Sequence, residues 1–327
     1  MTLPMIVCLS ANPALDRRLR VHSFLPGEVV RAQSSVVLPG GKAAHVAMAA
    51  SALGAHPIWI GFLGGAIGEE VAAGLRKLAI EVLPIRFERS TRVNLELIED
   101  SGRITEVLEP GEDPGSARRA EMLYLCAEGL RDRLKGGLLV ISGSLPPDVP
   151  TDFYASLIDA AHAAGSKVFL DTSGDALRAG LEAKPDFAKP NRKEAEALLG
   201  RPISDAEEAL AAAHELIRLG ARSAAVTLGA KGLVWLESED GPAWNARPPR
   251  LNPVSSVGCG DATLAGFAVA LLEGFAGEKA LRFAAACGAA NCLAEFEGRI
   301  SVDDVKSLIL QIELHRLQPV PHSPPDR

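Results

Sequence analysis

Short apolar runs alternate with helical periodicity through the second half of the chain. Residues 138–142 and 167–170 are two such runs, and each is followed by a turn rich in polar residues. The segments between the runs repeat apolar residues every three or four positions, which is typical of amphipathic helices. Further strands are predicted at 186–188 and 223–227, and helices at 116–134, 152–164, 175–181, 193–199 and 205–219. This pattern predicts an α/β fold with a doubly wound, mainly parallel sheet flanked by helices.

The first 110 residues continue this pattern but interrupt it with two β-rich patches. The α/β part comprises a strand at 5–9, a helix at 43–53, a strand at 57–62 and a helix ending near residue 78. The patches, about 17–38 and 86–110, alternate polar and apolar residues, and the second contains the turn Asp100-Ser101-Gly102. We interpret them as a small β-sheet lid over a single domain of residues 1–317. Four prolines within 318–327 predict a disordered tail.

One helix is apolar on nearly every side. It runs from Ala262 to Leu272 and follows Gly258-Cys259-Gly260-Asp261. A helix without a polar face is buried, so its unpaired N-terminal amides open inside the protein. Those amides and the helix dipole make an anion site, and the Asp261 carboxylate beside it suits phosphoryl transfer to a hydroxyl. Taken alone, Asp261 also fits an ordinary helix cap.

Polar residues and glycines recur where the predicted strands end. These positions are Asn12, Ser142, Asp171, Asn191 and Thr227, and Asp16 follows the first of them. The carboxyl ends of parallel strands share one edge of the sheet, so these residues predict one ligand crevice. Gly40-Gly41-Lys42 permits close approach of a ligand to the backbone and adds a cation, and His45 lies one helical turn further on.

Composition excludes several classes of function. The 327 residues carry a net charge of −7, which leaves no basic surplus for nucleic acid. The odd number of cysteines, five, fits reduced thiols in the cytoplasm, and we see neither a signal peptide nor a membrane span. There is no P-loop and no zinc motif, and the absence of a first-turn G-x-G-x-x-G weakens an oxidoreductase interpretation.

An ordered set of motifs resembles the ribokinase-like (PfkB-type) carbohydrate kinases, nearest to the branch that phosphorylates sugar phosphates. The set covers nearly the whole chain except the tail. It comprises Asn12-Pro13-Ala14-Leu15-Asp16, Gly40-Gly41-Lys42, Ser142-Gly143-Ser144, Asp171-Thr172-Ser173-Gly174, Lys189-Pro190-Asn191-Arg192-Lys193-Glu194, Thr227-Leu228-Gly229-Ala230-Lys231-Gly232 and Gly258-Cys259-Gly260-Asp261.

The resemblance implies roles for these residues around ATP and Mg²⁺. Asp261 corresponds to the base that takes the acceptor proton, and Gly258, Cys259 and Gly260 correspond to the anion hole. Asn191 and Glu194 match the pair that organises Mg²⁺ through water, which suits their oxygen atoms. The nucleotide side comprises Lys189, Asn191, Thr227, Gly229, Gly232 and Asn291.

The sugar end is implied in the same way. Asp16 would hold sugar hydroxyls, and Arg92, with Arg31, would grip the phosphate already present on the substrate, because an arginine fork suits a phosphate dianion. The remaining substrate positions are Gly41, Lys42, His45 and Ser142. A surface ion pair is the alternative interpretation of Arg92.

The chain departs from the family at one position, where Lys42-Ala43-Ala44-His45 replaces the usual Lys-Gly-x-Asn. The asparagine normally contacts the sugar, and a histidine there is bulkier and can carry charge near neutral pH. The change leaves open whether His45 contacts a phosphate, selects another sugar or impairs binding.

We therefore expect a kinase that converts fructose 1-phosphate to fructose 1,6-bisphosphate, with pairing of two copies through the lid. The alternatives are a kinase of tagatose 6-phosphate, of fructose 6-phosphate or of an unphosphorylated sugar or nucleoside. A non-catalytic sugar-phosphate sensor is a further alternative.

Overall fold

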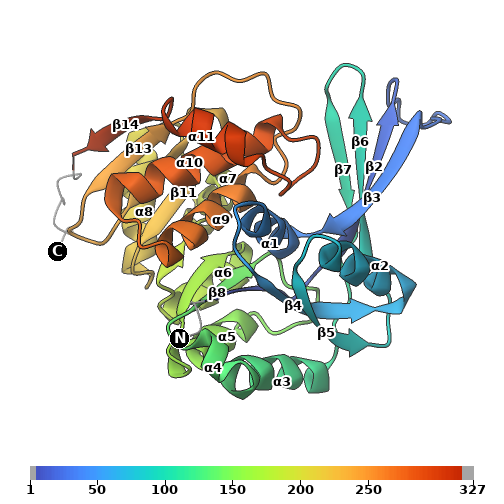
Figure 1. Cartoon of the computed structure of the whole chain (residues 1–327), viewed down its shortest axis with the longest axis horizontal. Coiled ribbons are helices and arrows are strands. Elements are labelled where there is room, and N and C mark those ends of the chain that lie inside the picture. The colour runs from blue at the N-terminus through green and yellow to red at the C-terminus, as the bar shows by residue number, and fades with distance from the viewer. Residues whose placement is uncertain (1–4, 319–327) are drawn as a thin grey trace.

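The structure, a computed structural model, describes residues 5–318 and contains one large sheet and one small sheet (Figure 1). Residues 319–327, where most of the predicted tail falls, lie outside the described residues. The large sheet has ten strands in the order β14-β13-β12-β11-β10-β9-β8-β1-β4-β5. These strands are β1 Ile6–Ser10, β4 Ile58–Gly64, β5 Glu81–Phe87, β8 Leu138–Ser142, β9 Lys167–Asp171, β10 Phe187–Ala188, β11 Ala224–Thr227, β12 Leu233–Leu236, β13 Ala243–Arg247 and β14 Glu313–Leu317.

The neighbouring strands β5, β4, β1, β8, β9, β10 and β11 all pair in parallel, and β12, β13 and β14 add an antiparallel edge. The predicted doubly wound, mainly parallel sheet is therefore confirmed. Along β1, Ile6 and Cys8 enter one hydrophobic core, while Val7 and Leu9 enter the other. Successive side chains of a strand point to opposite faces, so a strand covered on both faces has to be apolar throughout.

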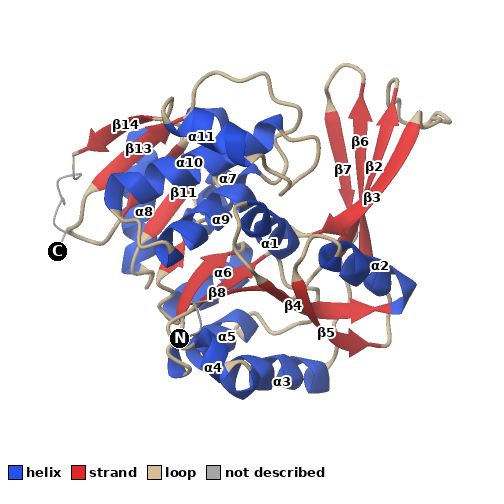
Figure 2. Cartoon of the chain, viewed as in Figure 1, coloured by secondary structure: helices blue, strands red, loops and turns tan. Residues whose placement is uncertain are grey.

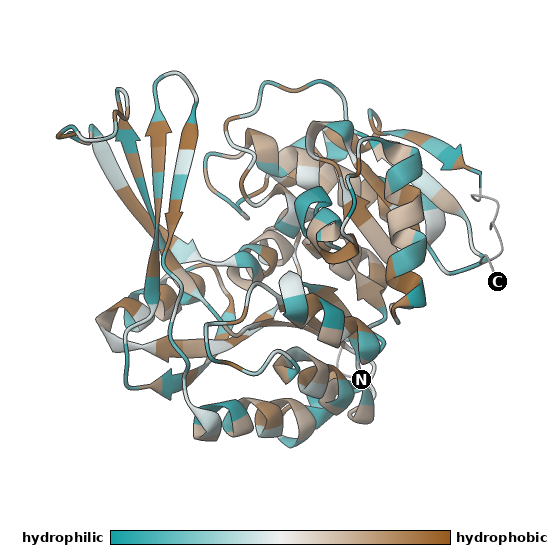
Figure 3. Ribbon diagram, turned by 180° about the vertical axis from the view of Figure 1, so that it is seen from behind, coloured by the Kyte–Doolittle hydropathy of each residue, from teal (hydrophilic) through white to brown (hydrophobic). Residues whose placement is uncertain are grey.

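Helices cover both faces of the large sheet (Figure 2). One face carries α1 Lys42–Ala52, α2 Gly65–Arg76, α9 Cys259–Leu272, α10 Gly277–Leu293 and α11 Val302–Ile309. The other carries α3 Ser116–Tyr124, α5 Phe153–Ala163, α6 Gly174–Glu182, α7 Arg192–Leu199 and α8 Ala206–Arg218. Figure 3 shows brown, hydrophobic residues along the strands and helices that meet in these layers.

The small sheet has the order β3-β2-β6-β7 and stands apart from the large one in Figure 1. Its strands are β2 Ala14–Val21, β3 Ser34–Gly40, β6 Arg92–Glu99 and β7 Ile104–Leu108. The sequence placed the second β-rich patch from about residue 86. The structure instead assigns residues up to Phe87 to β5, because they pair with β4 in the large sheet.

The helix predicted at 116–134 is interrupted. After α3, a π-helical turn covers Leu125–Gly129, and the short helix α4 covers Arg131–Leu134. Each π-turn takes one residue more than an α-turn and so shifts the apolar face. Met122, Cys126 and Leu134 are thereby all buried against the sheet, which periodicity alone did not reveal.

A buried ion cluster joins the small sheet to the segment that follows α10. Arg18 on β2 donates to the carboxylates of Glu96 on β6 and Glu297 and to the carbonyl of Glu295. Its guanidinium also lies 5.5 Å from the ring centre of Phe296. These contacts fix the small sheet against the body of the molecule.

Within residues 5–318, no helix is both long enough and apolar enough to cross a bilayer.

Candidate active site

Helix α9 is buried over most of its length, as its composition predicts, while Cys259 and Gly260 at its start are half-buried. Every residue from Asp261 to Ala270 is buried. The N-cap is Gly258, with φ of 74°, and no side chain caps the first turn. The first amides of the helix therefore keep no partner from the helix itself. The alternative interpretation of Asp261 as the cap is wrong, because its carboxylate contacts His45 instead.

His45 on α1 lies between two carboxylates. Its Nδ1 is 3.0 Å from Oδ2 of Asp261, and its Nε2 is 3.1 Å from Oδ2 of Asp16 on β2. Asn94 on β6 donates to the other oxygen of Asp16 at 2.8 Å. All four side chains are less than a tenth exposed. Sequence reasoning missed Asn94, although it pairs with Asp16 in the register of β2 and β6.

These contacts shift the pKa values of His45 and Asp16. Burial alone would lower the pKa of His45, but hydrogen bonds and the charges of Asp16 and Asp261 outweigh it and raise that pKa well above 6.5. Burial would raise the pKa of Asp16, but His45, Asn94 and the charge of Arg92 lower it below 3.8. Both shifts favour the charged forms, an imidazolium for His45 and a carboxylate for Asp16.

A second cluster surrounds Asp171 at the end of β9. Its Oδ1 accepts from Nζ of Lys42 at 3.1 Å, and Nζ of Lys189 lies 3.0 Å from Oδ2. Lys42 also donates to Oε1 of Glu194 at 2.7 Å. Lys42 was predicted at the sugar end, but the structure directs its ammonium to these two acids. Burial opposes the charge of Lys42, yet Asp171, Glu194 and Asp261 raise its pKa.

Asn191 and Glu194 begin α7 as a reciprocal capping box. The side chain of Asn191 accepts from the amide of Glu194 at 3.0 Å, and Oε2 of Glu194 accepts from the amide of Asn191 at 2.8 Å. The oxygen atoms of both residues are the donors that Mg²⁺ prefers. No group of three or more His, Cys, Asp or Glu side chains in the described part of the chain could hold a metal ion.

The remaining nucleotide-side positions lie around the same strand ends. Asn191 and Thr227 form an isolated parallel bridge. Gly229 and Gly232 have φ of 61° and 89° and bound a 3₁₀ turn after β11. A side chain at Gly260 would come within 3.4 Å of Nζ of Lys189, so this lysine lies beside the start of α9.

The side chain of Asn291 on α10 makes hydrogen bonds to backbone groups around the site. Its amide nitrogen donates to the carbonyl of Val257 at 2.8 Å, and its oxygen accepts from the amide of Gly298 at 2.8 Å. It thereby ties the turn before α9 to the segment after α10. In the same place, the sulfur atoms of Cys259 and Cys292 are 2.7 Å apart.

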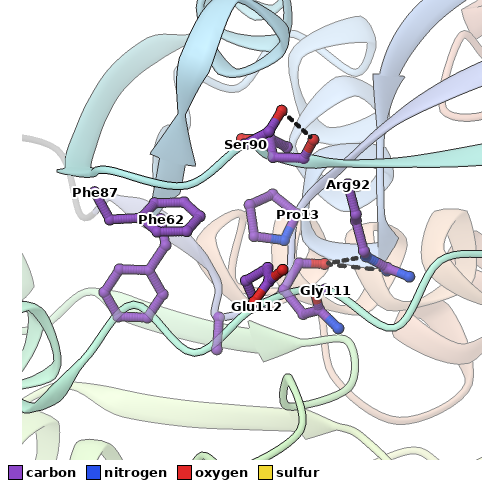
Figure 4. Close-up of a pocket in the computed structure, with 10 residues that line it drawn as sticks. Pro13, Phe62, Phe87, Ser90, Arg92, Gly111 and Glu112 are labelled. Carbon is purple, nitrogen blue, oxygen red and sulfur yellow. Dashed lines mark hydrogen bonds between the residues drawn. The ribbon is translucent and has the colours of Figure 1, made fainter.

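Arg92 begins β6 at the edge of a small pocket (Figure 4). Its guanidinium donates to the carbonyls of Asn12 and Glu109 and to the side-chain oxygen of Asn94, at 2.7 to 3.3 Å. Within residues 5–318 its hydrogen bonds thus go to neutral acceptors only. Burial lowers the pKa of Arg92, while the charges of Asp16 and Glu109 oppose that shift. The alternative of a surface ion pair is wrong for Arg92. These bonds use four of the five N–H donors, so an anionic ligand would meet the positive charge of Arg92 and its one remaining N–H.

Two predicted substrate residues differ from expectation. Arg31 is exposed in the connection between β2 and β3, which enters β3 at Ser34. The end of β3 that lies near the site is Gly40, so Arg31 does not reach the site of its own chain. Ser142 is fully buried, and its hydroxyl has no hydrogen-bond partner among the residues that the structure describes. Ser144, two residues on, accepts from the side chain of Asn12 at 3.2 Å. Gly41 adopts a φ of 88° beside the backbone of Pro13, as close approach requires.

A family profile described as pfkB family carbohydrate kinase matches residues 4–297. The chain belongs to this family. The resemblance drawn from the motifs is therefore confirmed, and with it a phosphotransferase that acts on an alcohol and uses ATP.

Individual relatives agree with the family. A 1-phosphofructokinase of Xanthomonas campestris is 38% identical over 82% of this chain and 84% of its own. A 1-phosphofructokinase of Vibrio cholerae is 31% identical over 96% of this chain and 98% of its own. Phosphofructokinase-2 of Escherichia coli, solved with fructose 6-phosphate, has a TM-score of 0.84 at 30% identity and covers 94% of this chain and 99% of its own. That enzyme is also described in a tetrameric inhibited form.

Proposed function

We propose that this kinase transfers the γ-phosphoryl group of ATP to a hydroxyl of a phosphorylated ketohexose, with fructose 1-phosphate as the first candidate. The observation that carries the proposal is an unbroken chain of hydrogen bonds. It runs from Arg92 through Asn94, Asp16 and His45 to Asp261. A cation suited to a phosphate thus stands at a fixed separation from a carboxylate at a helix N-terminus. A ketohexose phosphate presents the same two features, a dianion and a hydroxyl, within one small molecule.

Each residue of the site has its own role in the proposed reaction. Asp261 accepts the proton of the attacking hydroxyl, and Arg92 holds the phosphate already present on the sugar. The amides at Gly258, Cys259 and Gly260 stabilise the negative charge on the transferring group. Lys189, beside Gly260, adds positive charge there.

The nucleotide side is completed by Mg²⁺, which neutralises charge on the phosphates when it is bound. Asn191 and Glu194 would orient its water ligands, since their oxygens are hard donors at the start of α7. The small sheet serves as a lid that excludes water from the reaction. Two copies would pair through this lid, whose exposed apolar residues include Val36, Val37, Val107 and Leu108. Light scattering would distinguish that dimer from a tetramer like that of the Escherichia coli relative.

The test is ADP release with a panel of acceptors: fructose 1-phosphate, fructose 6-phosphate, tagatose 6-phosphate, fructose and ribose. We expect turnover with a phosphorylated ketohexose, and a loss of about 10²–10⁴-fold in kcat for Asp261→Asn with ATP binding retained. A fully active Asp261→Asn enzyme would refute the assigned base. Faster turnover of an unphosphorylated sugar would refute the substrate class.

Arg92→Ala tests the phosphate grip separately. Losing charged hydrogen bonds worth about 1.5–3 kcal/mol should raise the KM for the sugar phosphate about 10–100-fold and leave the KM for ATP unchanged. Arg103→Ala is the matched control, because Arg103 also lies at the small sheet but pairs with Glu99 near its exposed far end. Equal sugar-phosphate KM values for the two variants would contradict this role of Arg92.

A further inference from the structure

His45 has no free nitrogen. Its two ring nitrogens lie 3.0 and 3.1 Å from carboxylate oxygens of Asp261 and Asp16. An ionised carboxylate only accepts hydrogen bonds, so both contacts are satisfied together only when both ring nitrogens carry protons. With both carboxylates ionised, the geometry fits an imidazolium shared by two acids that belong to different elements, α9 and β2.

The contacts leave one oxygen of the catalytic carboxylate available. His45 occupies Oδ2 of Asp261, and among residues 5–318 no hydrogen bond reaches Oδ1. Asp16, by contrast, has both oxygens engaged, one by His45 and one by Asn94. The acceptor hydroxyl would therefore meet Oδ1 of Asp261, in an orientation that the bond to His45 fixes.

We propose that His45 is a positioning residue for phosphoryl transfer: as an imidazolium it holds the carboxylates of Asp261 and Asp16 in fixed relative orientation and so aims Oδ1 of Asp261 at the acceptor hydroxyl. This inference rests on the proposed function of Asp261 as the base. It also answers the question left open by the departure from the family motif. His45 does not donate to the sugar, because both of its donors are already committed.

An asparagine at position 45 could not orient both carboxylates in this way. A side-chain amide has donors only on its nitrogen, while its oxygen is an acceptor and repels a carboxylate. Its two N–H groups share a single nitrogen, so it could not donate to carboxylates on opposite sides of the side chain, as the two ring nitrogens of His45 do. The imidazolium also supplies one positive charge to a strongly acidic site. The charged groups around the ring are Asp16 and Arg92 from the small sheet, Glu106 on β7, Asp261 on α9, Lys42 on α1 and Glu297 after α10.

The ring can exchange its proton although it is buried. A cavity of about 270 Å³ reaches His45 from the side of α2, and its lining includes Lys77, Glu297 and Arg299. Lys77 and Arg299 are exposed, so this cavity opens to solvent. Loss of the proton would leave two carboxylates with a single N–H between them, and Asp261 would lose its fixed orientation.

The sign of the pH effect follows from this arrangement. The two acids raise the pKa of His45 above 6.5, so the imidazolium persists at neutral pH and is lost as the pH rises through that higher value. For the wild type, kcat should therefore decline on the alkaline side, while the KM for ATP stays constant. His45→Asn should show a kcat about 10–100-fold lower at pH 7.5, without that alkaline decline.

The experiment measures kcat and both KM values from pH 6 to 10 for the wild type, His45→Asn and His56→Asn. His56 is an exposed histidine just after α1 and should leave the whole profile unchanged. His45→Gln replaces His45→Asn if the latter does not fold. An alkaline decline that persists unchanged in the position-45 variant, or a variant kcat equal to the wild-type value, would overturn the proposal.

A second readout does not depend on activity. In the ¹⁵N NMR spectrum of the wild type, the two ring nitrogens of His45 should both be protonated at pH 7.5, and Asp16→Asn should shift the titration to lower pH. A neutral His45 ring at pH 7.5 would overturn the inference even in an active enzyme. Conversely, a protonated ring in a protein that phosphorylates none of the acceptors would refute the proposed function and leave the geometry of the ring intact.

Discussion

Arg18→Met should destabilise the fold severely and in a pH-dependent way. Arg18 is the cation of the cluster that joins β2 to the segment after α10. It is 9% exposed, and its partners Glu96 and Glu297 are 3% and 4% exposed. Methionine keeps much of the apolar volume but removes every donor. Two carboxylates would then face each other in a buried site.

The magnitude follows from the burial of these groups. Breaking a buried ion pair by removing one partner costs about 3–5 kcal/mol, because the remaining charge loses its compensation. Here two carboxylates remain, and the carbonyl of Glu295 loses its donor as well. At pH 8, above the pKa of about 7 that Glu96 has beside Arg18, we expect the free energy of unfolding to fall by about 3–5 kcal/mol.

The pH dependence has a definite sign. Burial and the charge of Glu297 already raise the pKa of Glu96 to about 7 in the presence of Arg18. An acid whose pKa is higher in the folded state than in the unfolded chain weakens the fold as the pH rises from its unfolded to its folded pKa. Removing the cation raises that pKa further. The cost of the substitution should therefore shrink to about 1–3 kcal/mol at pH 5.5, where a proton replaces the lost charge.

Urea unfolding at pH 5.5 and pH 8 measures both values, since the shift in midpoint at constant slope gives the change in stability. Arg17→Met is the matched control, because Arg17 is the neighbouring residue on the same strand and is exposed. It should change stability by less than about 0.5 kcal/mol. A loss for Arg18→Met no larger than that of the control, or one equal at the two pH values, would refute the reasoning.

Two further predictions concern the start of α9. Gly258→Ala should lower the free energy of unfolding by about 1–2 kcal/mol, because φ is 74° at this position. The loss should be larger than this, since a Cβ at position 258 would lie 2.9 Å from the Cβ of Glu297. The substitution should also raise the KM for ATP. Gly54→Ala is the control in the same unfolding assay, because Gly54 has a φ of 89° but open space around it, so only the backbone contributes to its loss. An equal loss of stability in the two variants would contradict the steric contribution of Glu297 at position 258. Diamide should join the sulfurs of Cys259 and Cys292, which lie 2.7 Å apart, by taking two protons and two electrons from them. The number of free thiols per chain should then fall by about two in the wild type and should not fall in Cys292→Ser. An unchanged number in the wild type would show that the two sulfurs do not meet.

The sequence by itself determined the architecture and the catalytic motif. Alternating short apolar runs and amphipathic segments specify strands buried on both faces, because the periods of strand and helix are local properties of the chain. An apolar helix led by Gly258 and Gly260 identified the buried N-terminus for the same reason. The break of the helix at 116–134 escaped this reasoning, because a π-turn leaves no distinct apolar period.

The partners of the charged side chains were decided only by the tertiary structure. His45 meets Asp261 across 216 positions of sequence and Asp16 across 29, and Arg18 meets Glu297 across 279. Periodicity states which face of an element is buried but not which element lies against it. For this reason the sequence placed Lys42 at the sugar, whereas in the folded chain its ammonium reaches Asp171 at the end of β9 and Glu194 in the first turn of α7. The same packing makes His45 the link between two acids.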